Sequence, residues 1–388
     1  MNKYSSYILY LLLSILVAIL SINDFGPLAG LQRTINDALC SFTASDGMRP
    51  NVLLVRIDDR AQEKFGPLPW NHDLVADLTA AVSTGEPKAI VLDMELSEDA
   101  DQDSAGYTDI LAQQLQFIPQ TILRYDIALA TYRSNKTSNP DELFKNSITV
   151  EDPLGLMDEN ASLLVRKVFL PADKLLDHKP LMGFHYHRPD NDRLLRHQPL
   201  LMNYEGFYYP SVSLLAAAAF LDIPTDQIKA VENEEVQLGL MRRVPINTGG
   251  DFYVNYSRGV PFMQYSASDV LSDEFKFNMF KGKVVLIGPS DMDAVEVFET
   301  PVEPATSSMV VKGTIIENII NDNMLEIRDD LATVSLLIIL ALGGICAFVL
   351  PRVSLMYRMI ILGGALILLA NANYLLFSTY HMVVETVY

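Results

Sequence analysis

Three apolar runs divide this chain and constrain its fold more than any other feature. They are Tyr7–Ile22, Leu331–Leu350 and Met359–Phe377, and a long polar block separates the first from the second. The last two runs are close to the roughly 20 residues that a helix needs to cross a bilayer core of about 30 Å. The first is shorter and follows Lys3, as in a signal peptide, but no small-x-small cleavage pattern follows it. We therefore predict an uncleaved anchor, two further membrane helices and one water-soluble domain between them.

The basic residues that flank the apolar runs predict the orientation of the chain. Lys3 precedes the first run, and Arg352 and Arg358 lie between the second and the third. Because Lys and Arg stay on the cytoplasmic side, the block 24–330 is expected outside the cell membrane. We predict spans at 1–23, 331–350 and 359–377. Residues 378–388 resemble the start of a further span, so we expect the native protein to continue beyond Tyr388.

The charge of the central block limits its partners. The chain has 29 Lys+Arg and 48 Asp+Glu, and only Lys3, Arg352, Arg358 and Glu385 lie outside the block, which leaves 26 basic against 47 acidic residues. Such a surface repels nucleic acid, so we expect no nucleic-acid partner. Cys40 is the only cysteine of the block, since Cys346 lies in an apolar run. The domain is therefore expected to fold without an internal disulfide.

The block alternates short β-branched runs with segments of helical periodicity. Its first half predicts strands at 51–57, 88–92 and 121–125 and helices at 72–82 and 107–115. The second half predicts strands at 181–186, 195–203, 251–256 and 283–287, helices at 212–221 and 313–323, and an acidic connector at 222–235. This order predicts right-handed crossovers and an α/β fold, with a mostly parallel sheet and covering helices.

Short motifs follow one another along the block. They are VLLVRIDDR at 52–60, Pro69-Trp70, KAIVLD at 88–93, an aspartate-rich turn and arginine-marked strand at 189–200, YPSVS at 209–213, VNY at 254–256, SASDVL at 266–271, FKGKVVLIG at 280–288, Thr300-Pro301 and VKGTIIEN at 311–318. In this order they resemble the type-2 CHASE domain, an extracellular sensory module of bacterial receptors. The chain departs from the family pattern at 191–193, where a glycine-bearing turn is usual, and at Lys312-Gly313, where proline-glycine is usual.

The resemblance implies the sensor and anchor region of an inner-membrane receptor. It implies a periplasmic or extracellular domain that detects a small-molecule or ion cue, contact with membrane lipid, a homodimer, and a cytoplasmic nucleotide cyclase, diguanylate cyclase or kinase as output. A membrane-tethered binding or scaffold protein is the alternative. No hydrolase elbow, metalloprotease helix or phosphate loop is present in the sequence, so we expect no catalytic residues and no enzyme activity of this chain.

The predicted strand ends suggest where a cue would bind. Ligands of parallel α/β sheets favour the crevice beyond the carboxyl ends of the strands. Acidic residues follow three of these strands, and we take the following as candidate ligand-binding residues: Asp58, Asp59, Arg60, Asp93, Glu95 and Asp291. The carboxylates would suit a hard cation or a cationic small molecule. Two alternatives are that Arg60 pairs with them and that each aspartate caps the following helix or turn.

His185 and His187 alternate along a predicted strand, a spacing that can present two imidazoles to a metal. The sequence shows no obvious third ligand. We therefore expect two partly exposed histidines near a loop, no metal site there and no cofactor. Binding of a divalent cation elsewhere in the sensory domain is left as an alternative.

Overall fold

The computed structural model describes residues 12, 15–16, 26–97, 106–129, 143–151, 163–231, 235–247, 249–290, 296–327 and 329–383. The chain divides into two compact units. One is Ala44–Met324, and the other joins Met1–Thr43 to Leu325–Tyr388.

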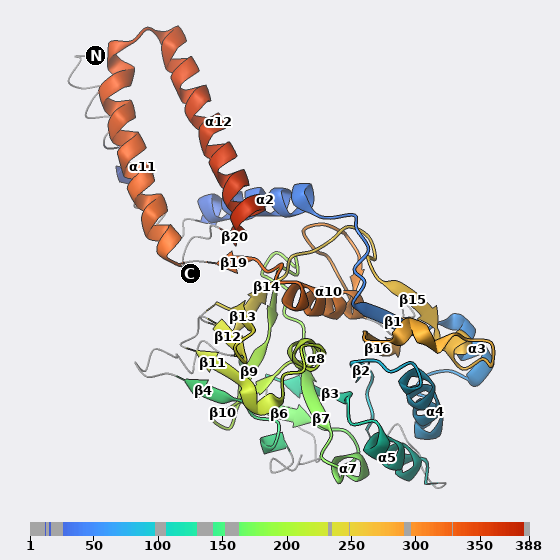
Figure 1. Ribbon diagram of the computed structural model, residues 1–388. Helices are drawn as coiled ribbons and strands as arrows, with labels where there is room; N and C mark the ends of the chain where they lie inside the picture. Colours follow the sequence, from blue (N-terminus) through green and yellow to red (C-terminus); the bar gives the residue numbers. More distant parts are fainter. Residues whose placement is uncertain are drawn as a thin grey trace. The chain divides into compact units, whose positions relative to one another are not determined.

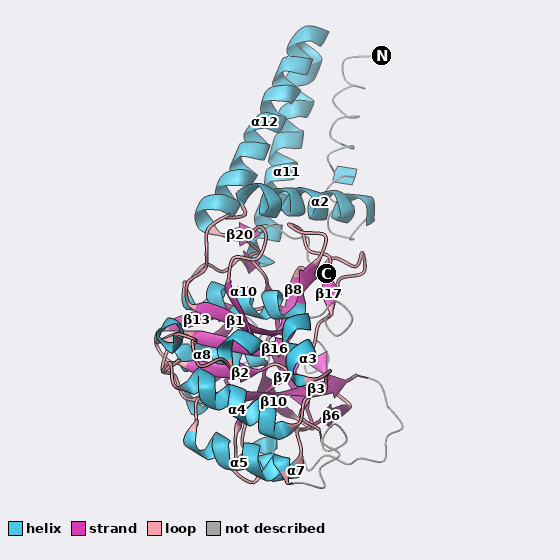
Figure 2. Cartoon of the chain, turned by 90° about the vertical axis from the view of Figure 1, so that its right-hand side faces the viewer, coloured by secondary structure: helices cyan, strands magenta, loops and turns pink. Residues whose placement is uncertain are grey.

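A mostly parallel sheet runs through the first unit. Its strands, in spatial order, are β15 (Met263–Ser266), β1 (Val52–Ile57), β16 (Val284–Pro289), β2 (Ala89–Leu92), β3 (Thr121–Ala128) and β7 (Leu181–His185). Figure 2 shows the strands from β1 to β3 in this order. All of these pairings are parallel, and only β6 (Lys167–Phe169) joins β3 in the antiparallel sense. The expected α/β fold is confirmed.

Helices cover both faces of this sheet. One face packs on α3 (Asp59–Phe65), α4 (His72–Ser83), α5 (Tyr107–Phe117), α7 (Asp173–Leu176) and α9 (Ala267–Val270), and the other on α8 (Val212–Phe220) and α10 (Ser308–Ile320). Figure 1 shows α4 and α5 on the opposite side of the strands from α8 and α10. Because side chains alternate along a strand, Leu53 and Val55 enter the first core and Val52 and Leu54 the second. The sheet is therefore buried on both faces, as parallel sheets require.

Smaller sheets surround this core, and of their strands the sequence predicted only those within 195–203 and 251–256. They are β10 (Phe207–Pro210), β9 (Leu201–Tyr204) and β5 (Leu163–Leu164); β13 (Arg242–Pro245), β12 (Glu235–Leu238), β11 (Ile228–Val231) and β4 (Thr149–Glu151); β14 (Asp251–Tyr253) with β8 (His197–Pro199); and β17 (Val297–Phe298) with β18 (Thr306–Ser307). Short 3-10 helices occupy Thr225–Gln227 and Phe277–Phe280. The expectation of an acidic connector at 222–235 is wrong, because strand β11 lies within this segment.

Two element boundaries also differ from the expectation. The single strand predicted at 195–203 is broken at Leu200, whose N–H donates to the Gly250 oxygen (3.1 Å) and whose oxygen accepts from the Ser211 N–H (2.8 Å). These bonds divide the run between two sheets. Helix α10 begins at Ser308 instead of 313, because the Ser307 hydroxyl accepts from the Val310 N–H and caps the helix.

The second unit contains α2 (Gly26–Thr43), α11 (Asp329–Val349), a 3-10 turn (Leu350–Arg352) and α12 (Leu355–Tyr380). Two short strands, β19 (Glu326–Ile327) and β20 (Met382–Val383), pair in parallel. Among the described residues, α12 is long and apolar enough to cross a membrane, and the apolar stretch Leu340–Arg352 is shorter. Most of the first predicted span and residues 384–388 lie outside the described part of the chain.

Candidate functional site

Polar side chains replace apolar ones where one face of the central sheet reaches its carboxyl edge. On β2 and the residue after it, buried Val91 is followed by Asp93, and on β3, Ile122 is followed by Arg124 and Asp126. These positions are two residues apart, so they share the face that packs on α8 and α10. In register with Asp126, His185 ends strand β7. The core of this face therefore gives way to a charged edge.

Lys312 of α10 forms a buried ion pair with Asp93 at this edge. Its Nζ lies 2.6 and 2.7 Å from the two carboxylate oxygens and 2.9 Å from the Ser308 hydroxyl. Both side chains of the pair are 4% exposed. Burial alone would raise the pKa of Asp93, but the charges of Lys312 and Arg124 outweigh it and hold that pKa below its usual range. Burial lowers the pKa of Lys312, and Asp93 partly offsets the change.

Arg124 links this pair to Asp126. Its guanidinium lies 3.5 Å from Asp93 and 2.9 Å from Asp126. Burial raises the pKa of Asp126, and the positive charge of Arg124 opposes that rise. The two cations Lys312 and Arg124 are thus matched by two carboxylates, which is what buried charge requires.

A chain of hydrogen bonds orients His187. The Gln198 Nε2 donates to the His197 carbonyl oxygen (2.9 Å), so the Gln198 Oε1 faces the Nδ1 of His187 at 2.6 Å and requires a proton there. The other nitrogen, Nε2, lies 2.7 Å from the Ser308 hydroxyl, which also accepts from Lys312. Burial and the Lys312 charge lower the pKa of His187 to about 3. His187 is therefore a neutral imidazole with an unprotonated Nε2.

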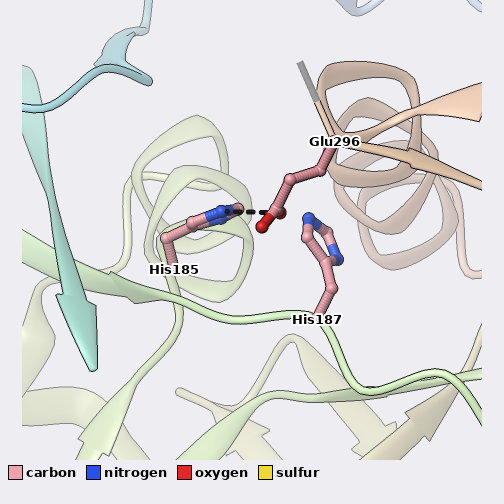
Figure 3. A group of neighbouring side chains, drawn as sticks. All are labelled: His185, His187 and Glu296. Carbon is pink, nitrogen blue, oxygen red and sulfur yellow. Dashed lines mark ion pairs between the residues drawn. The ribbon is translucent and has the colours of Figure 1, made fainter. Parts of the chain in front are cut away.

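His185 and Glu296 lie beside His187. The His185 Nε2 is 3.3 Å from the Glu296 Oε2, and each of the three side chains offers one ligand atom within 4.8 Å of the other two. Figure 3 shows the Glu296 carboxylate between the two imidazoles. Burial lowers the pKa of His185 well below its usual value. The expectation that both histidines are partly exposed is wrong for His185, which is 7% exposed. Glu296 is the third potential ligand that the sequence did not reveal.

Two cavities adjoin this edge. The smaller, about 100 Å³, is lined by Asp93, Arg124, His185, Pro289, Glu296, Ser308 and Met309. The larger, about 370 Å³, extends past the carboxyl half of β1, and Pro289 and Met309 line both. Its volume is within the range of small-molecule sites.

The structure gives internal partners to several of the predicted ligand-binding residues. Asp58 caps α3, accepting from the Ala61 N–H (3.1 Å), and also accepts from Ser266 (2.6 Å). This is the capping role considered as an alternative. Asp59 lies in the first turn of α3, and Arg60 pairs with Asp269 at 2.9 Å.

The other three predicted ligand-binding residues, Asp93, Glu95 and Asp291, do not share one environment. Asp93 belongs to the charged edge, whereas Glu95 is exposed and Asp291 lies outside the described residues. Within the described part of the chain, the group with metal-ligand geometry is His185, His187 and Glu296, and the predicted carboxylates do not form another. Their role in binding stays a prediction.

Sequence reasoning missed Arg124, Asp126, Glu296 and the position of Lys312 at the edge. Arg124 and Asp126 did leave a signal, since charges at alternate positions interrupt an otherwise apolar strand. Glu296 gave no such signal in the sequence, because it follows His185 by more than a hundred residues.

Two polar residues near the end of α10 connect segments of the unit. Glu317 is fully buried in α10 and accepts from the backbone N–H groups of Asn51 (2.6 Å) and Val52 (3.0 Å). Its neighbour Asn318 accepts from the Asn255 N–H (2.9 Å) and donates to the Asn255 oxygen (3.1 Å). The motif at 311–318 therefore fixes the start of β1 and the segment 254–256 to α10.

These features define an α/β domain with a charged site at the carboxyl edge of its sheet. The family model of the CHASE2 domain matches residues 11–347, most of the chain. The chain therefore belongs to the CHASE2 family, whose domain is an extracellular sensory domain of signalling receptors. Comparisons with curated proteins and with solved structures found no match.

Proposed function

We propose that this chain is the sensor and membrane-anchor region of a bacterial signal-transduction receptor. In this proposal the α/β unit binds an extracytoplasmic small-molecule or ion cue at the carboxyl edge of its sheet. The main support for this proposal is the pair of adjoining cavities at that edge. Met309 of α10 lines both of them.

The position of α10 in the chain supports a role in coupling. It is the last helix of the α/β unit and contributes Ser308, Met309 and Lys312 to the edge. Strand β19, which belongs to the second unit, begins six residues after the end of α10 at Ile320. A cue can change the receptor only by binding two states with different affinity. We expect α10 and the segment 325–330 to carry that difference, in a homodimer whose cytoplasmic output is a cyclase or kinase.

Membrane attachment is part of the proposal. Helix α12, with 26 largely apolar residues, supports one span. We assign a second span to α11 and place the connecting residues Arg352 and Arg358 in the cytoplasm, because basic residues remain on that side.

Reporter fusions test this arrangement. Alkaline phosphatase, which folds only outside the cytoplasm, should be active when fused after Asp330 and inactive when fused after Arg352. A cytoplasmic reporter such as β-galactosidase at the same two positions is the matched control and should give the inverse result. The opposite pattern would place the α/β unit in the cytoplasm and refute an extracytoplasmic sensor.

A further inference from the structure

Two imidazoles and one carboxylate meet beside the smaller cavity, which His185 and Glu296 line. The Nε2 atom of His187 is unprotonated, and the Nε2 atom of His185 already lies 3.3 Å from Glu296. We infer that His185, His187 and Glu296 bind a divalent transition-metal ion of the zinc class, with a fourth coordination position open toward the cavity.

The distances support a shared ion. With bonds of about 2.0–2.1 Å, two ligand atoms on one tetrahedral zinc ion lie about 3.3 Å apart. The pair formed by His185 and Glu296 has that separation, and the remaining ligand atoms lie within 4.8 Å. Glu296 is 60% exposed, so its side chain is free to move the additional distance.

The surrounding hydrogen bonds resemble those of metal-binding histidines. Such a histidine usually donates its second ring N–H to an oxygen acceptor, which fixes the tautomer. His187 does so to Gln198 at 2.6 Å. The Ser308 hydroxyl, which now occupies Nε2, would release that nitrogen and keep its bond to Lys312.

The two ring nitrogens of His185 differ in their surroundings. Nε2 faces Glu296 at 3.3 Å, whereas the buried Nδ1 has no hydrogen-bond partner among the described residues. The nitrogen that would bind the ion is Nε2, so the support for His185 as a ligand comes from the position of this atom.

The local charge permits a cation. The positive charges of Lys312 and Arg124 repel a cation, but Asp93 and Asp126 pair with them. The negative charge of Glu296 therefore remains uncompensated within this group. Two nitrogen ligands favour zinc and similar ions, whereas calcium and magnesium prefer oxygen ligands throughout. The site is thus different in kind from the hard-cation rim that the acidic strand ends predict.

Binding of the ion requires no output domain or membrane topology. Only its role as a cue, or as the anchor for a small-molecule cue at the open position, rests on the proposed function. The reporter fusions and a metal titration can therefore fail separately.

The test is a calorimetric titration of the full chain, purified in detergent without a histidine tag, with zinc chloride. We expect one zinc ion per chain with a dissociation constant of about 1 μM or lower. His185→Gln, His187→Gln and Glu296→Gln should each weaken binding by about 100-fold or more, since loss of even an outer-shell partner costs about 10–100-fold. His178→Gln and Glu63→Gln are matched controls at exposed positions and should bind like the native chain.

Folding and ligand identity are checked separately. The emission of buried Trp70, the single tryptophan, reports whether each variant folds, and Glu296→Gln should fold because the side chain is largely exposed. Zinc K-edge absorption of the loaded chain should show two imidazoles. Absence of stoichiometric binding below millimolar zinc would overturn the inference. Binding that survives all three substitutions in folded protein would do the same, as it would place the ion elsewhere.

Discussion

Replacement of Lys312 by methionine should destabilise the α/β unit markedly, because it leaves the Asp93 carboxylate buried. At an effective dielectric constant of about 20, unit charges 2.7 Å apart attract by about 6 kcal/mol, and the burial of both charges offsets much of that. Loss of one partner of a buried pair costs about 3–5 kcal/mol. Arg124 remains 3.5 Å from Asp93 and compensates in part. We therefore expect a loss of about 3 kcal/mol.

Thermal unfolding of the full chain in detergent, followed by Trp70 fluorescence, measures this loss. Trp70 is 5% exposed and packs edge-to-face on Phe65, so its emission reports on this unit. A loss of about 3 kcal/mol corresponds to a decrease in Tm of roughly 6–12 °C for a domain of about this size. Lys281→Met is the matched control, because its ion pair with Glu86 is exposed and contributes little.

A double variant separates the ion pair from simple packing. Asp93→Leu combined with Lys312→Met removes both charges, so it should be less destabilising than the sum of the two single substitutions by about 1–3 kcal/mol. If Lys312→Met unfolds at the same temperature as Lys281→Met, or if the two single effects add, Lys312 and Asp93 are not a mutually dependent buried pair.

Two other expectations follow from buried groups of the same unit. Glu317→Ala should lower the free energy of unfolding by about 2–4 kcal/mol, because two backbone N–H groups at the start of β1 lose a charged acceptor. Chemical denaturation with Trp70 fluorescence as the probe would measure this loss. A loss below about 1 kcal/mol would contradict the assigned role. Stability should fall as the pH decreases from 6.5 toward 3, since the unfolded chain protonates His187 in that window while the folded domain, with a pKa of about 3, does not. The share of His187 should approach about 4 kcal/mol at most. His187→Gln should reduce the slope and leave the share of His185, whose pKa is also lowered by burial. An unchanged slope in that variant would assign the pH dependence to other groups.

The sequence predicted the central sheet well because its strands are short β-branched runs that must be buried on both faces. It predicted a helix at 212–221, close to the observed Val212–Phe220, for a similar reason, since small apolar residues continue around the whole helix. It failed at the start of α10, which it placed at Gly313 instead of Ser308. In the structure that glycine allows close packing, because a Cβ there would lie 3.0 Å from the Phe262 ring. The capping serine that begins the helix lies further back.

The candidate site was predictable only in part. Asp93 was identified because it follows a strand, and the place of the site at the carboxyl edge follows from topology. The chemistry of the site was not predictable, since it depends on Glu296, Ser308 and Lys312, which only tertiary folding brings to the histidines. At Arg193 the chain carries a positive φ of 74°, where a glycine would be unstrained.

In the proposed receptor, ligand binding at the carboxyl edge is passed through α10 to the second unit. Hydrogen exchange of the full chain in lipid nanodiscs, with and without zinc, would detect this coupling. We expect zinc to slow exchange in Ser308–Ile320 and to change it at Glu326–Ile327, with Glu296→Gln abolishing both effects. Slower exchange confined to the zinc ligands and their immediate neighbours, with α10 and β19 unchanged, would contradict the claim.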